Sequence, residues 1–166
     1  ASILEYNDTK APISSVTIND KSFTGNKGVI GIVGAGNFTS ATILPNLKKL
    51  NAAIKYIASS GGLSSTTMAK QSNIANSTTN YKEILSDTDT DLVLITTKHN
   101  MHAAMVLESL KADKSVFVEK PLALLTEELD EIIDEYNQRN VSVSVGFNRR
   151  FAPLAKQMKR VLGNDN

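Results

Sequence analysis

The sequence predicts a doubly wound α/β domain, in which helices cover both faces of a mostly parallel sheet. Three observations support this prediction. Strand-like and helix-like segments alternate from residue 29 onward. The strand-like runs, such as LVLITT at 92–97, are almost wholly apolar, which is typical of strands buried on both faces. A glycine turn, Gly34-Ala35-Gly36, joins the first of these strands to a helical segment.

Composition and charge narrow the class of protein. The 166 residues suffice for one domain with a sizeable core, and 41% hydrophobic with 21% charged residues is typical of a soluble globular chain. A net charge of +1 gives no field that would attract nucleic acid or a membrane surface, so we expect neither as a partner. The absence of cysteine excludes disulfides and thiolate metal sites and agrees with a cytoplasmic location.

The first part of the chain has two regions. Residues 1–26 contain turn formers without a sustained period, and we interpret them as an arm or linker that precedes a domain at 27–150. Hydrophobic patterning then predicts the following elements, with Pro45 at a helix kink: a strand at 29–33, a helix at 37–50, a strand at 54–58, a helix at 63–71, a short strand at 77–79 and a short helix at 81–85.

The second part continues the alternation. It predicts a strand at 92–97, a helix at 101–111, a strand at 116–118, a helix at 126–138, a strand at 141–147 and a helix from 151 to 162. Thr126 is the expected N-cap of the fourth of these elements. The carboxyl ends of parallel strands meet at one edge of a sheet, so we expect 34–39, 96–102 and 119–121 to meet there.

The glycine turn has the sequence context of a dinucleotide site. Gly34 permits a tight turn, Gly36 lets a pyrophosphate approach the backbone, and the helix from Asn37 offers free N–H groups. Thr39 replaces the third glycine of the G-x-G-x-x-G pattern. We expect it to move the helix outward slightly without loss of phosphate contacts. The alternative is a structural turn that binds no ligand.

The second strand should end at the ribose of such a ligand. A site that prefers NAD usually has Asp or Glu about 20 residues beyond the glycines, but no acidic residue occurs between Asp20 and Glu83. Ser59 and Ser60 stand at that corner, and Lys55 and Lys70 are the only cations nearby in sequence. The cofactor is therefore NAD or NADP, and the missing acid favours NADP. The alternative is a plain surface turn.

Glu119-Lys120-Pro121 ends the strand SVFV. If Lys120 points into the crevice beside a nicotinamide, its ammonium can orient a hydroxyl or carbonyl and take part in proton transfer. Pro121 fixes the local backbone and allows a cis bond to Lys120. The alternative is that two soluble residues occupy an exposed strand end. His99 and His102 lack cysteine or carboxylate neighbours, so we expect no metal site.

Four stretches carry a family resemblance: GIVGAGNFTS, LITTKHNMHAAMVLESL, VFVEKPLAL and VGFNRRFAPL. In this order, and with His102 18 residues before Lys120, they resemble the N-terminal Rossmann domain of the glucose–fructose oxidoreductase/inositol dehydrogenase (Gfo/Idh/MocA) family. They are most similar to a subgroup in which this module follows a zinc alcohol dehydrogenase-like module in one polypeptide. Residues 1–26 would then be the tail of that module or a linker.

The resemblance implies an oxidoreductase that moves hydride between NAD or NADP and a hydroxyl carbon of a sugar or cyclitol. A catalytically silent Rossmann module, serving as a nucleotide sensor or interaction scaffold, is the alternative. The resemblance also implies residue roles: Lys120 as the catalytic lysine; Gly34, Gly36, Asn37 and Phe38 at the pyrophosphate; Ser59 and Ser60 at the adenosine ribose; Thr96, Thr97 and His99 along the cofactor, supported by His102; Glu119 at the ribose or carboxamide; and Asn148 and Arg149 near cofactor or substrate.

Besides Thr39, the sequence departs from the family pattern in two further respects. The family's usual Thr-Pro-Asn reads Thr97-Lys98-His99, so a histidine replaces an amide. The family's second domain, which contacts the small-molecule substrate, is missing, and 151–166 would begin the helix that crosses toward it. We therefore expect the isolated chain to be inactive and its exposed surface to favour a homo-oligomer.

Overall fold

The computed structural model describes residues 13–163, and seven strands in this part form one sheet in the order β1-β4-β3-β2-β5-β6-β7. Strands β2 to β7 run parallel, and β1 pairs antiparallel with β4 at one edge. The chain order reverses between β2 and β5, which confirms the predicted doubly wound fold. The strands are β1 (Ser15–Thr17), β2 (Ile30–Val33), β3 (Ile54–Ala58), β4 (Asn76–Thr78), β5 (Leu92–Ile95), β6 (Ser115–Glu119) and β7 (Val143–Gly146).

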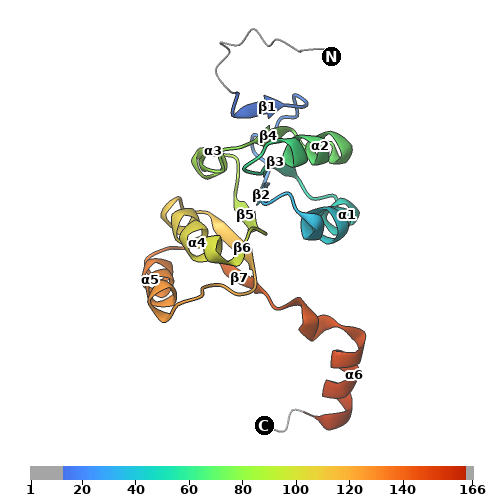
Figure 1. Ribbon diagram of the computed structural model, residues 1–166, viewed down its shortest axis with the longest axis vertical. Coiled ribbons are helices and arrows are strands. Elements are labelled where there is room, and N and C mark those ends of the chain that lie inside the picture. Colours follow the sequence, from blue (N-terminus) through green and yellow to red (C-terminus); the bar gives the residue numbers. More distant parts are fainter. Residues whose placement is uncertain (1–12, 164–166) are drawn as a thin grey trace, which may run out of the picture.

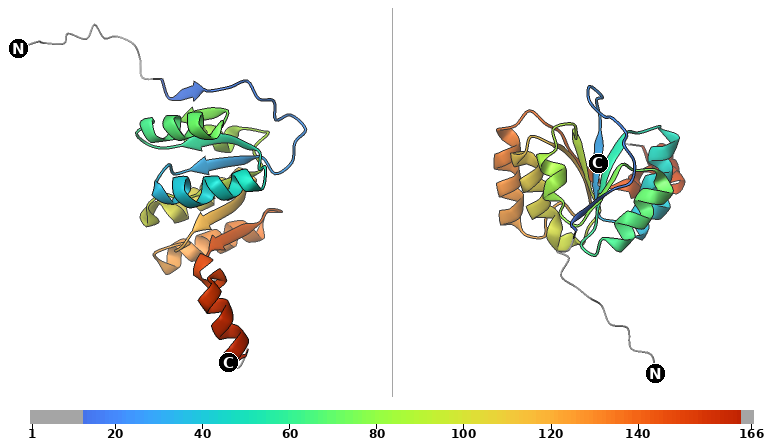
Figure 2. Two further views of the ribbon diagram at one scale, coloured as in Figure 1. Left: turned by 90° about the vertical axis from the view of Figure 1, so that its right-hand side faces the viewer. Right: turned by 90° about the horizontal axis from the view of Figure 1, so that it is seen from above.

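Helices cover both faces of this sheet (Figures 1 and 2). One face carries α1 (Leu44–Lys49) and α2 (Leu63–Ser72). The other carries α3 (Lys82–Ser86), α4 (His102–Lys111) and α5 (Thr126–Asn137). The last helix, α6 (Pro153–Leu162), has no buried residue and extends away from the sheet.

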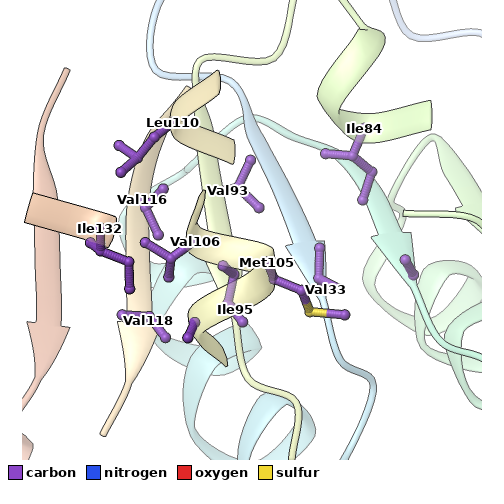
Figure 3. Close-up of a cluster of buried hydrophobic side chains, with 12 residues drawn as sticks. Val33, Ile84, Val93, Ile95, Met105, Val106, Leu110, Val116, Val118 and Ile132 are labelled. Carbon is purple, nitrogen blue, oxygen red and sulfur yellow. The ribbon is translucent and has the colours of Figure 1, made fainter. Parts of the chain in front are cut away.

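Side-chain alternation along the strands divides the core into two clusters. Val93 and Ile95 of β5 pack with Val116 and Val118 of β6 beneath α3, α4 and α5 (Figure 3). Leu94, between the two β5 residues, belongs to the cluster on the α1 and α2 face. Because both faces of these strands are buried, both alternating sets are apolar, which explains the continuous apolar runs in the sequence.

The helical segment after the glycine turn is wider than an α-helix at its start. Residues Thr39–Ile43 form a π-turn, in which the N–H of Leu44 donates to the carbonyl of Thr39. Pro45 follows in the first turn of α1, where it needs no N–H partner. The sequence predicts one helix that is kinked at Pro45. In the structure the departure from regular α-helix is instead the π-turn that precedes this proline.

The start of α5 differs from the prediction. Leu125 occupies the N-cap position, and the Glu128 carboxylate accepts bonds from the N–H groups of Leu124 (2.9 Å) and Leu125 (3.2 Å). The expectation that Thr126 caps this helix is wrong, because Thr126 is already the first helical residue. A charged carboxylate at the third position reaches back to the free N–H groups instead.

The segment before residue 29 contributes to the domain although the sequence predicts no strand there. Strand β1 pairs Ser15 with Thr78 of β4, and Phe23 is buried against Val29 and Ala75. A three-residue strand is too short to produce a detectable period. The part of the predicted arm that covers residues 1–12 lies outside the described residues.

Candidate functional site

The glycine turn and the end of β5 lie side by side at the carboxyl edge of the sheet. The N–H of Thr96 donates to the carbonyl of Val33 at 2.8 Å, and the Thr96 hydroxyl donates to the carbonyl of Gly34 at 3.0 Å. Strand β6 pairs with β5 in register, so Glu119 ends at the same edge. The predicted meeting of these strand ends is confirmed.

A cleft of about 620 Å³ opens at this edge, a size that suits a small-molecule ligand. Its walls come from the ends of four neighbouring strands and the loops that follow them. The lining residues are Val33, Gly34, Ala35, Gly36, Ala58, Ser59, Ser60, Thr79, Tyr81, Thr96, Thr97, Lys98, Met101 and Met105.

The two glycines of the turn have different structural roles. Gly34 has φ of +115°, and a Cβ there would lie 2.5 Å from Thr96 Oγ1, so the fold itself requires glycine. Among the described residues, no atom other than those of its chain neighbours lies within 4 Å of a Cβ built on Gly36. The space above Gly36 is therefore free for a ligand, as the approach of a pyrophosphate to the backbone requires.

Thr39, which replaces the third glycine, is fully buried in the same region. Its hydroxyl donates to the carbonyl of Gly34 at 2.7 Å and lies 2.8 Å from the Thr96 hydroxyl. The π-turn begins at Thr39.

The two serines of the predicted ribose corner are not equivalent. The Ser59 hydroxyl donates to Ser65 Oγ (3.0 Å) and accepts from Ser64 Oγ (3.1 Å) and the Ser65 N–H (3.4 Å). A hydroxyl has one hydrogen and two lone pairs, so Ser59 has no free capacity. Ser60 is exposed, and its hydroxyl bonds to nothing in the described part of the chain, so it is the one available to a ligand.

Neither cation that the sequence offers near this corner lies there. Lys55 bonds Asp87 (2.5 Å) and Asp89 (2.8 Å) at the start of β3, away from the cleft. Burial lowers the pKa of Lys55, but these two partners outweigh it and raise the pKa above its ordinary value. Lys70 lies in the last turn of α2, at the end of the helix far from Ser60.

His102 connects two loops at this edge from a fully buried position. Its Nδ1 lies 2.7 Å from the carbonyl oxygen of Pro121, and its Nε2 lies 3.1 Å from the carbonyl oxygen of Thr97. Carbonyl oxygens only accept, so each contact is a hydrogen bond when the facing nitrogen carries a proton. The exposed ring of His99 stands edge-on to His102, with centroids 5.6 Å apart.

Lys120 follows β6 directly, is exposed, and forms a cis bond with Pro121, as the sequence allowed. Glu119 accepts a weak bond from the Asn148 side-chain amide at 3.4 Å, which brings the ends of β6 and β7 together. Several predicted residues stand outside the cleft lining: Asn37 and Phe38 at the helix start, His99 and His102 at the start of α4, and Glu119, Lys120, Asn148 and Arg149 after β6 and β7.

The structure also adds cleft residues that the sequence did not single out. Thr79 and Tyr81 follow β4, and Met101 and Met105 face them from the start of α4. The Tyr81 hydroxyl donates to Glu108 at 2.7 Å, and burial together with this bond raises the pKa of Tyr81 to about 12. Thr79 directly follows the end of β4, so the strand-end position that marks the other three segments also marks this residue in the sequence.

Within residues 13–163, no group of three or more histidine, aspartate or glutamate side chains is placed to hold a metal ion. None of the helices in that part of the chain has the length and apolar character needed to span a membrane.

The chain is similar to known oxidoreductases. A family model described as "Oxidoreductase family, NAD-binding Rossmann fold" (GFO_IDH_MocA) matches residues 29–147. Myo-inositol 2-dehydrogenase of Thermotoga maritima is 32% identical over 136 residues, which cover 81% of this chain and 40% of that protein. An inositol 2-dehydrogenase/D-chiro-inositol 3-dehydrogenase of Lactiplantibacillus plantarum is 32% identical over 137 residues, covering 80% of this chain and 39% of that protein.

Solved structures give the same result. A levoglucosan dehydrogenase in complex with NADH and levoglucosan superimposes with a TM-score of 0.71 at 27% identity, covering 81% of this chain and 38% of that one. The chain thus spans about 40% of the length of the relatives that it matches.

Proposed function

The chain belongs to the Gfo/Idh/MocA oxidoreductase family, and we propose on this premise that residues 29–147 bind the nicotinamide cofactor of a dehydrogenase. The full-length protein transfers hydride between that cofactor and a hydroxyl carbon of a sugar or cyclitol. The free space above Gly36, facing the cleft, is the observation that carries the proposal. This chain alone binds dinucleotide weakly and turns over no substrate.

The cofactor's parts are assigned to successive strand ends. The pyrophosphate rests on Gly34 and Gly36 at the helical segment that starts with Asn37 and Phe38, where free N–H groups favour an anion. The adenosine ribose meets Ser60, and Ser59 holds the corner in shape. Toward the nicotinamide, the cofactor passes Thr96, Thr97 and His99, and then Glu119, Asn148 and Arg149.

Lys120 is the proposed catalytic residue. The bound nicotinamide supplies or accepts the hydride. Lys120 lies at the end of β6, two strands from the glycine turn, and no carboxylate forms an ion pair with it among the described residues. Its ammonium is therefore available to hydrogen-bond the reacting oxygen and to hold or release a proton there. Proton transfer at this oxygen would accompany the change between hydroxyl and carbonyl.

The ribose corner favours NADP. An acidic side chain would repel a 2′-phosphate, but none lines the cleft and none stands in the first turn of α2. The α2 N-terminus follows Ser60 closely, and its positive dipole end suits a phosphate. The free Ser60 hydroxyl supplies a further hydrogen-bond donor.

The remaining parts of the protein lie outside this chain. We propose that a second domain follows and contacts the substrate, because the apolar side of α6, formed by Leu154, Met158 and Val161, is exposed. We also propose that a zinc alcohol dehydrogenase-like module precedes this domain in the same polypeptide, and that the protein is homo-oligomeric and cytoplasmic.

Two measurements test the proposed function. Titration of this chain with NAD, NADH, NADP and NADPH should show binding, with the phosphorylated forms bound more tightly. In the full-length protein, Lys120→Ala should abolish hydride transfer to an inositol or sugar substrate while cofactor binding persists, and Lys111→Ala, an exposed lysine on α4, should leave the rate unchanged. No dinucleotide binding by the wild-type chain would refute the first proposal, and an unchanged Lys120→Ala rate would refute the second.

A further inference from the structure

We infer that Lys98 binds the pyrophosphate of the dinucleotide, an inference that rests on the proposed cofactor binding. Lys98 is the only charged side chain among the residues that line the cleft in the part of the chain described. The other lining residues are glycine, apolar residues, hydroxyl-bearing residues and methionine. A pyrophosphate carries negative charge, and the glycine turn offers it N–H groups but no compensating cation.

The Lys98 ammonium is available for this contact. The side chain is exposed, and within residues 13–163 no carboxylate lies within ion-pair distance of its Nζ. Its backbone is held, because the Lys98 carbonyl accepts a bond from the Met101 N–H at 2.9 Å. His102 holds the preceding residue through the carbonyl of Thr97. The structure thus combines a fixed backbone with a free ammonium on a flexible stem.

The sheet order decides which part of the cofactor Lys98 can reach. Lys98 follows β5, which neighbours β2 and the glycine turn, and Thr96 bonds directly to that turn. Ser60 follows β3, one strand further away on the far side of β2. Neighbouring strands lie about 4.8 Å apart, so the pyrophosphate above β2 is closer to Lys98 than the 2′-phosphate position at Ser60.

The contact would also explain a departure from the family pattern. The position held by Lys98 is a proline in the family's usual Thr-Pro-Asn, and proline offers neither a charge nor a hydrogen-bond donor. In this chain the loop therefore adds a cation to a cleft that otherwise binds phosphate through backbone groups alone. Lys98 is accordingly a binding residue, distinct from Lys120 after β6.

Binding titrations of this chain with NADH, NADPH and ADP-ribose at low and high salt test the inference. Lys98→Ala and Lys98→Gln should weaken all three ligands to a similar extent, by roughly tenfold, and should reduce the salt dependence of binding. Lys98→Arg should restore most of the affinity. Lys111→Ala is the matched control, and thermal unfolding of each variant checks the fold.

The results separate this inference from the proposed function. Wild-type chain that binds none of the three ligands would refute cofactor binding itself. Wild-type binding that Lys98→Ala and Lys98→Gln leave unchanged would overturn the inference alone. A loss confined to NADPH would place Lys98 at the 2′-phosphate, and a loss for NADH without a loss for ADP-ribose would place it at the nicotinamide; either result overturns the pyrophosphate assignment.

Discussion

The hydroxyls of Thr39 and Thr96 lie 2.8 Å apart and connect the helical segment after β2 to the end of β5. The Thr39 hydroxyl donates its one hydrogen to the carbonyl of Gly34 at 2.7 Å, and the Thr96 hydroxyl, which lies 3.0 Å from the same carbonyl oxygen, donates either to it or to the Thr39 oxygen. Three chain segments therefore meet in one half-buried hydrogen-bonded cluster beneath the proposed phosphate position. A residue that departs from the glycine pattern thus contributes bonds that glycine cannot make.

Replacing Thr39 by valine keeps the shape of the side chain and removes its hydroxyl. The half-buried Thr96 and Gly34 oxygens would each lose a partner, so we expect the free energy of unfolding to fall by about 1 kcal/mol. Thr42→Val, at an exposed position on the same helical segment, is the matched control and should change stability little. Denaturant unfolding measures both, and equal effects of the two substitutions would contradict a role for the cluster.

Alanine should have a different effect at each glycine of the turn: a loss of stability at Gly34 and a loss of cofactor binding at Gly36. Gly34→Ala combines positive φ with a clash against Thr96, so we expect a loss of stability of at least about 2 kcal/mol. Gly36→Ala meets no protein atom, so the unfolding midpoint should stay near the wild-type value. Its methyl group would occupy the space of the pyrophosphate, so NADPH binding should weaken at least about tenfold. A Gly36→Ala chain that binds NADPH normally would argue against the phosphate position.

His102 should stabilise the edge of the sheet by donating a ring N–H to one of the two carbonyls that it faces. His102→Phe keeps a ring but has no N–H, so the carbonyl of Thr97 or Pro121 loses this donor, and we expect stability to fall by about 1 to 3 kcal/mol. His102→Gln keeps an amide donor group at the end of its side chain, so the stability of this variant should lie between those of wild type and His102→Phe. His99→Phe, at the exposed neighbour, is the control. If thermal unfolding shows the same stability for His102→Phe and His99→Phe, the proposed stabilising role of His102 is wrong.

Most of the fold was predictable because strands buried on both faces produce apolar runs that are hard to mistake. The β3 bounds agree with the prediction residue by residue. Strand β5 ends at Ile95, before the β-branched Thr96 and Thr97 that the prediction included, and β7 lacks the first two residues and the last residue of the predicted 141–147. Strand β1 was missed because its three residues carry no pattern, and the pairing with β4 exists only in three dimensions. The prediction that Thr126 caps α5 is wrong because the Glu128 carboxylate, three residues after the cap position, bonds the free N–H group instead.

The site was predictable only to the level of strand ends. The glycine turn and Thr96 line the cleft, and the sequence points to both because each follows a recognisable strand. The sequence could not show that the Ser59 hydroxyl is already saturated, since Ser65 lies in the next helix. Nor could it show that Asp87 and Asp89 hold Lys55 at the opposite end of its strand. Side-chain partners of this kind depend on how the elements pack.

The edge strand β1 should make stability depend on pH through Glu83. The Glu83 carboxylate accepts bonds from the hydroxyls of Ser14, at 3.0 Å, and Ser15. The bond from Ser15 lowers the pKa of Glu83 below its ordinary value of 4.5, with smaller contributions from Thr78 and Ser14, and these outweigh the opposing effect of burial. Because the folded-state pKa is the lower one, this stabilisation is complete above the unfolded-state value and disappears as the pH falls through the folded-state value.

Glu83→Gln tests this dependence, because glutamine keeps the shape of the side chain but cannot titrate. The difference in unfolding free energy between wild type and variant should be largest near neutral pH and should shrink as the pH falls below about 4.5. Asp87, whose pKa is also lowered in the folded state, titrates in both chains and cancels in the comparison. Glu127→Gln, on the exposed surface of α5, should show no such trend. A difference that stays constant from neutral pH to pH values well below 4.5 would mean that the carboxylate charge does not hold β1 in place.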